Sequence, residues 1–174
     1  MIRRLRSLSL IVSMSLLAGT LTRAQVSDRE IAQRVIEAIT NYPHYTVFDS
    51  IDIGVDNRTV VIGGRVTTPK KKDEIEQRIR RIDGIRTLSN EIGVLPVSPS
   101  DDELRYRVAH AIYGHPMFWI FAQMPVPPIH IIVERGRITL TGAADSEVQK
   151  SLAATLAQVS GSLGVTNRIR VDRR

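Results

Sequence analysis

The 174-residue sequence has no cysteine, and aromatic side chains make up only 5% of it. Without a thiol the chain can form no disulfide, bind no metal through sulfur and use no cysteine nucleophile. It also lacks a Gly-x-Ser-x-Gly nucleophile elbow and a phosphate-binding glycine loop. Its four histidines, His44, His110, His115 and His130, do not have the spacing of a metal site. We therefore expect a protein that is not an enzyme and that uses no cofactor or metal ion.

The N-terminal segment has the three-part order of a secretory signal peptide. Three arginines precede an uncharged apolar run at residues 8–19, and the segment closes on Ala24. The run is shorter than the roughly 20 residues that a transmembrane helix needs, so a retained anchor is the weaker alternative. Thr20 stands where a bacterial lipoprotein signal has its acceptor cysteine. We expect residues 1–24 to be removed and the mature protein to be periplasmic without a lipid anchor.

The charge of the chain depends on this cleavage. The whole sequence carries a formal net charge of +6, from 24 basic and 18 acidic residues. Removing the four arginines of residues 1–24 leaves 20 basic residues against the same 18 acidic ones. The mature chain is therefore close to neutral, and its composition does not support binding to nucleic acid.

The mature sequence contains an internal repeat. The pattern from Ser27 to Pro43 recurs from Ser100 to Pro116, 73 positions later. Both copies open with Ser-x-x-Glu, the capping box of a helix start, followed by apolar residues at helical spacing. We therefore predict a tandem duplication in which an amphipathic helix opens each copy, at Ser27 and at Ser100.

The remaining elements also recur in the same order. Each copy continues with a β-hairpin, a second helix and an alternating final strand. The expected hairpins cover residues 51–64 and 129–142, the second helices begin at Thr68 and at Asp145 or Ser146, and the last strands span 88–94 and 165–171. This order predicts an α+β fold of two tandem αββαβ modules, each a small three-stranded sheet covered on one face by two helices. The modules span residues 25–97 and 101–174, with a linker at 98–100.

The closing half of each copy resembles a known family. The first copy reads Gly64-x-Val66, then a helix, then Gly84-Ile85-x-x-Leu88-x-Asn90-x-Ile92-x-Val94. This resembles the BON domain, named for the bacterial osmotically inducible Y and nodulation proteins. The second copy is similar at Gly142, Gly161, Val165, Asn167, Ile169 and Val171, but it has Ala144 and Ser162 in place of Val66 and Ile85. The resemblance implies a non-enzymatic periplasmic or envelope protein whose modules bind phospholipid surfaces or envelope partners.

Several polar and glycine positions have a structural interpretation. Glycine lacks a Cβ and can turn the chain where a strand or helix ends, which we expect at four positions: Gly64, Gly84, Gly142 and Gly161. Asn90 and Asn167 are expected to cap free backbone groups near the last strand. The acidic run 101–103 lies in the first turn of a predicted helix, where carboxylates complement the amide dipoles; a cation site is the alternative.

The first candidate binding site is an apolar segment of the second copy. Phe118, Trp119, Ile120 and Phe121 stand in an unbroken run, and three prolines follow by residue 128. The corresponding stretch of the first copy is shorter and half polar, so we expect more apolar surface than one small module buries. The run forms either an exposed patch for a membrane or partner protein, or, as segment 117–128, an interface between the two copies.

The second candidate is a basic run on the second helix of the first copy. Lys70, Lys71 and Lys72 are expected to remain unpaired, because the acids further along this helix precede its arginines by four residues and neutralise them. The partners we expect are anionic phospholipid or an envelope protein, through peripheral contact with the membrane. The alternative function is a structural or assembly module that binds a protein or peptidoglycan.

Overall fold

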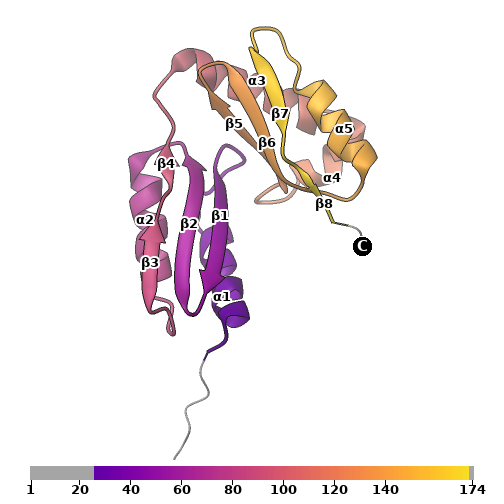
Figure 1. Cartoon of the computed structure of the whole chain (residues 1–174). Coiled ribbons are helices and arrows are strands. Elements are labelled where there is room, and N and C mark those ends of the chain that lie inside the picture. Colours follow the sequence, from indigo (N-terminus) through magenta and orange to yellow (C-terminus); the bar gives the residue numbers. More distant parts are fainter. Residues whose placement is uncertain (1–25, 173–174) are drawn as a thin grey trace, which may run out of the picture.

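The computed structural model describes residues 26–172, and the expected signal peptide at residues 1–24 lies outside them. Two α+β modules follow one another along the chain, and the helices of each lie on one side of its sheet (Figure 1). Each module has its own cluster of buried apolar side chains. Within residues 26–172, no helix has the length and apolar character needed to span a bilayer.

The first module has the expected αββαβ order. Its elements are α1 (Asp28–Thr40), β1 (Ser50–Asp56), β2 (Thr59–Val66), α2 (Pro69–Arg80), β3 (Thr87–Asn90) and β4 (Gly93–Val94). The central strand β2 pairs antiparallel with β1 and parallel with β3 and β4. Apolar residues at every second position of β2 point toward the helices: Val60, Ile62 and Val66 are buried.

The second module repeats this topology with an insertion after its first helix. Its elements are α3 (Pro99–Tyr113), a 3₁₀ turn η1 (Pro116–Phe118), α4 (Trp119–Ala122), β5 (Ile129–Glu134), β6 (Arg137–Ala144), α5 (Glu147–Leu156), β7 (Gly164–Asn167) and β8 (Arg170–Val171). Here β6 is central, antiparallel to β5 and parallel to β7 and β8. The predicted class and the two-module architecture are confirmed.

The last strand of each module is interrupted, where one continuous strand was expected. The Oδ1 atom of Asn90 accepts a hydrogen bond from the backbone N–H of Ile92 at 3.1 Å, and Asn167 does the same for Ile169 at 3.1 Å. The side-chain amide thus supplies the acceptor at a point where the strand ladder is broken. This confirms the capping role expected for the two asparagines and explains why β3 and β4, like β7 and β8, are separate.

The start of α3 differs from the prediction. The N-cap is Ser98, whose Oγ accepts from the N–H of Asp101 at 3.2 Å, so the helix begins at Pro99 and the box expected at Ser100 is wrong. Proline is favoured in the first helical position because it has no N–H to leave unpaired. Residues 99 and 100 therefore belong to α3 instead of a linker. The caps expected at Ser27 and Thr68 are confirmed, and Ser146 is the cap of α5.

An acidic residue in the first turn of each opening helix holds the adjacent hairpin turn. The buried carboxylate of Asp101 accepts hydrogen bonds from the N–H groups of Arg135 and Gly136, both at 2.8 Å. In the first module the carboxylate of Asp28 accepts in the same way from both residues of its turn, at 2.7 and 2.8 Å. The sequence predicted a helix-dipole role for Asp101, with a cation site as the alternative, and not its contact with the turn. Within residues 26–172, no group of three or more metal-binding side chains gathers there or elsewhere.

Gly64 and Gly142 occupy equivalent bends in β2 and β6. Their φ angles are +103° and +91°, and a Cβ would lie 2.1 and 1.9 Å from the carbonyl oxygens of Ser50 and Pro128. Any larger residue would have to push the neighbouring chain away, so both positions require glycine. Positive φ angles are also found in the turns after α2 and α5, at Gly84 and Gly161.

Replacing Asp101 and Asp28 tests how much their hydrogen bonds to the hairpin turns stabilise each module. Asp101→Ala removes a carboxylate that is only 3% exposed and leaves two N–H groups without their charged acceptor, so we expect the unfolding free energy to fall by about 2–3 kcal/mol. Asp28→Ala is the matched control in the other module, where the carboxylate is half-buried, and its cost should be nearer about 1 kcal/mol. Urea unfolding followed by circular dichroism measures both, and equal losses would contradict the buried role of Asp101.

The separate cores predict that residues 25–97 fold alone. All buried apolar residues of the first cluster lie within residues 31–92. A fragment of this size has a marginal core, so we expect a folded domain of low stability. A heteronuclear NMR spectrum of the fragment should be dispersed, and a collapsed spectrum would show that the module needs its neighbour.

Candidate functional site

The apolar segment of the second module forms two short helical turns, η1 and α4. Phe118 is fully buried and Phe121 is only 5% exposed, and both pack in the core of the second module. Residues three apart lie on the same side of a helix, which is why this pair points inward together. The expectation that all four residues of the run share one surface is therefore wrong for the two phenylalanines.

The opposite side of the same turns faces solvent. Trp119 and Ile120 are each 68% exposed, and Met117 and Met124 beside them are exposed as well. No residue between 116 and 128 carries a charge. We call these four residues the α4 apolar surface.

The sequence contained a signal for the buried pair that we did not use. Tyr42 and Tyr45 in the first module have the same spacing as Phe118 and Phe121, and both are buried in their own core. Each module therefore fills the end of its core with two aromatic rings three residues apart. The two phenylalanines therefore belong to the core of the second module. Only Trp119 and its exposed neighbours lie outside it.

The lysine run is not the free cluster that the sequence predicted. The Nζ atom of Lys71 lies 2.6 Å from Oδ2 of Asp49, and the two side chains are 12% and 0% exposed. Lys70 lies 3.8 Å from Glu74, an exposed i,i+4 pair. Of the three, only Lys72 makes no ion pair within residues 26–172. Lys71 therefore has a structural role. The sequence analysis missed it because the burial of the Asp49 carboxylate was not expected.

The lysine run and the α4 apolar surface are far apart. In Figure 1, α2 lies at the outer left side of the first module, whereas α4 lies in the second module to the right. The structure therefore does not bring the two predicted binding features onto one surface.

The two modules meet through the loop before β1 and strand β5. The backbone N–H of Ile131 donates to the carbonyl oxygen of Val47 at 2.7 Å. Phe48 packs against the core of the second module, and in exchange Val126 packs against the core of the first. The ring of Phe48 also meets Tyr106 edge-on, with centroids 5.3 Å apart. The interface expected for segment 117–128 is therefore confined to its proline-rich end.

A buried histidine lies in this contact. The ring of His130 is 5.4 Å from that of Tyr45, and its Nδ1 atom is buried without a hydrogen-bond partner. Burial lowers the pKa of His130, although the carbonyl groups of Thr46 and Asp49 favour its charged form. Burial also raises the pKa of Tyr45. Both rings are therefore neutral at pH 7, and the contact is apolar in character.

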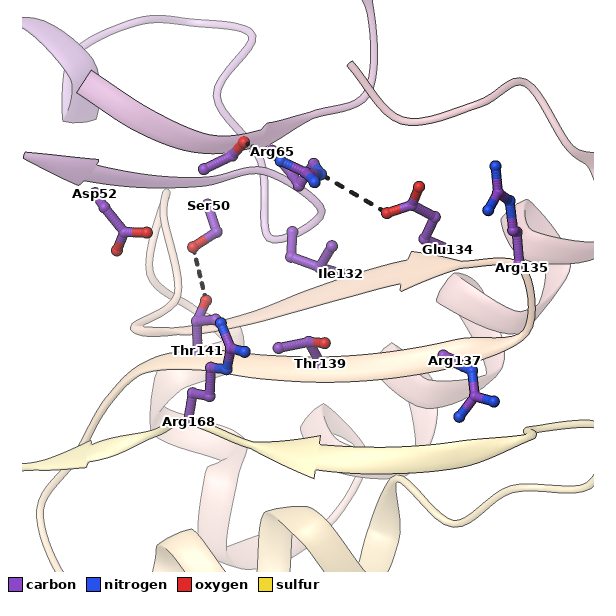
Figure 2. Close-up of a pocket in the computed structure, with 11 residues that line it drawn as sticks. Ser50, Asp52, Arg65, Ile132, Glu134, Arg135, Arg137, Thr139, Thr141 and Arg168 are labelled. Carbon is purple, nitrogen blue, oxygen red and sulfur yellow. Dashed lines mark hydrogen bonds and ion pairs between the residues drawn. The ribbon is translucent and has the colours of Figure 1, made fainter. Parts of the chain in front are cut away.

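A polar cleft opens beside this contact, between the faces of the two sheets that carry no helices (Figure 2). Its volume is about 580 Å³. The hydroxyl groups of Ser50 and Thr141 join the two walls at 2.8 Å, and Arg65 Nε lies 3.7 Å from Glu134 Oε2 across it. The remaining lining side chains with charge are Asp52, Arg135, Arg137 and Arg168. The sequence analysis missed this cleft, because it is formed by residues from both modules.

Comparison with known proteins places the fold in a family. The BON domain model matches residues 27–96 and 120–173. No curated protein matched the chain. Two solved structures of CdsD, a structural protein of the type III secretion system of Chlamydia trachomatis, are similar at 14% and 13% identity. They cover 84% and 83% of this chain and 68% and 93% of theirs, with TM-scores of 0.35 and 0.30. The chain belongs to the BON domain family and carries two such domains in tandem.

Proposed function

We propose that this chain is a non-enzymatic envelope protein that docks on phospholipid bilayers through the α4 apolar surface. The observation that carries the proposal is the division of α4 into two sides, with Phe118 and Phe121 anchored in the core and Trp119 and Ile120 turned to solvent. The anchors hold the exposed pair in place before any contact, which lowers the entropy cost of docking.

The chemistry of the segment suits the boundary between water and lipid. A tryptophan ring is apolar and carries one N–H that stays hydrated at the headgroup level. Residues 116–128 bring no charge that would have to leave water. The α4 apolar surface is small, so the attachment is peripheral and reversible.

The proposal also covers the compartment of the protein and the contribution of charge to lipid binding. We infer secretion to the periplasm from the signal peptide expected at residues 1–24. Because Lys70 and Lys71 are paired and α2 lies away from α4, the lysine run makes only a small contribution, and binding should depend weakly on salt.

Fluorescence of Trp119, the single tryptophan, tests the docking directly. We expect a blue shift on adding vesicles of phosphatidylglycerol and phosphatidylcholine, and a similar shift with phosphatidylcholine alone, because charge contributes little to the docking. In a vesicle flotation assay, Trp119→Ala with Ile120→Ala should reduce binding at least about tenfold, since burying two such side chains contributes roughly 3–6 kcal/mol at most. The matched control is Val148→Ala, which removes an exposed apolar side chain from α5. Equal binding by both variants would contradict the proposal.

The two sides of α4 should separate stability from binding. Phe118→Ala should lower the unfolding free energy by about 3–5 kcal/mol because it empties a buried site. The Trp119 and Ile120 replacements should leave the melting temperature nearly unchanged, because their side chains are exposed. Differential scanning calorimetry measures this contrast. A large loss of stability from Trp119→Ala, with no vesicle shift in the unaltered protein, would favour the alternative of a structural or assembly module that binds protein or peptidoglycan.

A further inference from the structure

We propose that the cleft between the two sheets is a binding site for a phosphate group, separate from the α4 apolar surface. Its volume of about 580 Å³ lies in the range of small-molecule sites. This site differs from the membrane-docking surface, since it needs no bilayer and is formed by residues of both modules.

The charge of the cleft is the first support. Its lining contains four arginines and two carboxylates. The part of the chain that the structure describes has 18 basic and 18 acidic residues, because four arginines precede residue 26 and Arg173 and Arg174 follow residue 172. A local excess of positive charge within a neutral body favours an anion at this place.

Three of these arginines have no partner of their own. Within residues 26–172, the side chains of Arg135, Arg137 and Arg168 make no ion pair or hydrogen bond with protein. Arg65 reaches Glu134 only at 3.7 Å, which is longer than a charged hydrogen bond. Arg65 Nη1 also donates to the carbonyl oxygen of Gly64 at 3.0 Å. The guanidinium groups of Arg135, Arg137 and Arg168 are therefore free to form the paired N–H contacts that suit phosphate oxygens, and that of Arg65 is only partly engaged.

The arrangement of the walls is the second support. Figure 2 shows Arg65 entering from the first module and Arg168 rising from the second beside Thr141. The hydroxyl groups of Ser50, Thr139 and Thr141 line the same space. Arg135 stands further along, at the turn that Asp101 holds. Arg65 and Arg168 therefore share one end of the cleft with the hydroxyl groups, which can supply neutral donors to a phosphate group bound there.

The test is an NMR titration of the full mature chain with inorganic phosphate and with glycerol 3-phosphate at fixed ionic strength. We expect saturable shifts of the backbone amides of Ser50, Thr139 and Thr141. Arg65→Gln with Arg168→Gln should weaken binding about tenfold or more, because each removes a charge-assisted contact at the end of the cleft that carries the hydroxyl groups. Arg29→Gln, which removes an exposed arginine of α1, is the matched control and should change nothing.

The outcomes distinguish the sources of the phosphate group. Saturation by free phosphate esters identifies a soluble ligand. If only phosphatidylglycerol vesicles bind, and the Arg65 and Arg168 replacements weaken that binding, the ligand is a lipid headgroup. The Trp119 and Ile120 double variant should keep its phosphate affinity, so failure of membrane docking would leave this site standing. Shifts that are linear, scattered over the surface or unaffected by the arginine replacements would overturn the inference.

Discussion

The buried carboxylate of Asp49 is the constraint on which the arrangement of the two domains depends. It is fully buried and accepts hydrogen bonds from the N–H and hydroxyl groups of Thr46 and Thr67, in addition to its ion pair with Lys71. A charge in this position is tolerated because both carboxylate oxygens accept hydrogen bonds from these donors. These contacts fix the loop at residues 46–50, and that loop supplies Val47, Phe48 and Ser50 to the second domain.

The second domain fixes the corresponding loop with different residues. The bend at Gly142 faces Pro128 as the bend at Gly64 faces Ser50, so Pro127 corresponds in position to Asp49. Prolines restrict the backbone before folding and need no network of donors. After the duplication, one copy therefore holds this loop by polar contacts and the other by rigid residues. The rigid copy carries the α4 apolar surface immediately before its prolines.

Local sequence patterns were sufficient to predict the helices and strands. They could not predict contacts between residues that are distant in the sequence. The Ser-x-x-Glu box at Ser27 and the alternation of Leu88 to Val94 follow from short-range geometry, so the αββαβ order could be predicted. The partner of Lys71 is 22 positions away in a loop, and no spacing rule connects it to Asp49. The burial of Phe118 could have been predicted from its match to Tyr45, an aromatic residue 73 positions earlier in the repeat that is also buried. The cleft could not have been predicted from the sequence, because it depends on how the two folded domains contact each other.

The hydrogen bond between Val47 and Ile131 has a consequence for self-association. Strands β1 and β5 are both at the edges of their sheets, where unpaired backbone groups can recruit a strand from another chain. Two separate domains of this topology would offer four such edges. Because the loop before β1 takes the N–H of Ile131, the inner edges are turned toward each other within one chain. This contact engages part of the inner edge of β5, while the outer edges are formed by the short and interrupted strands β3–β4 and β7–β8, which are poor templates for polymerisation.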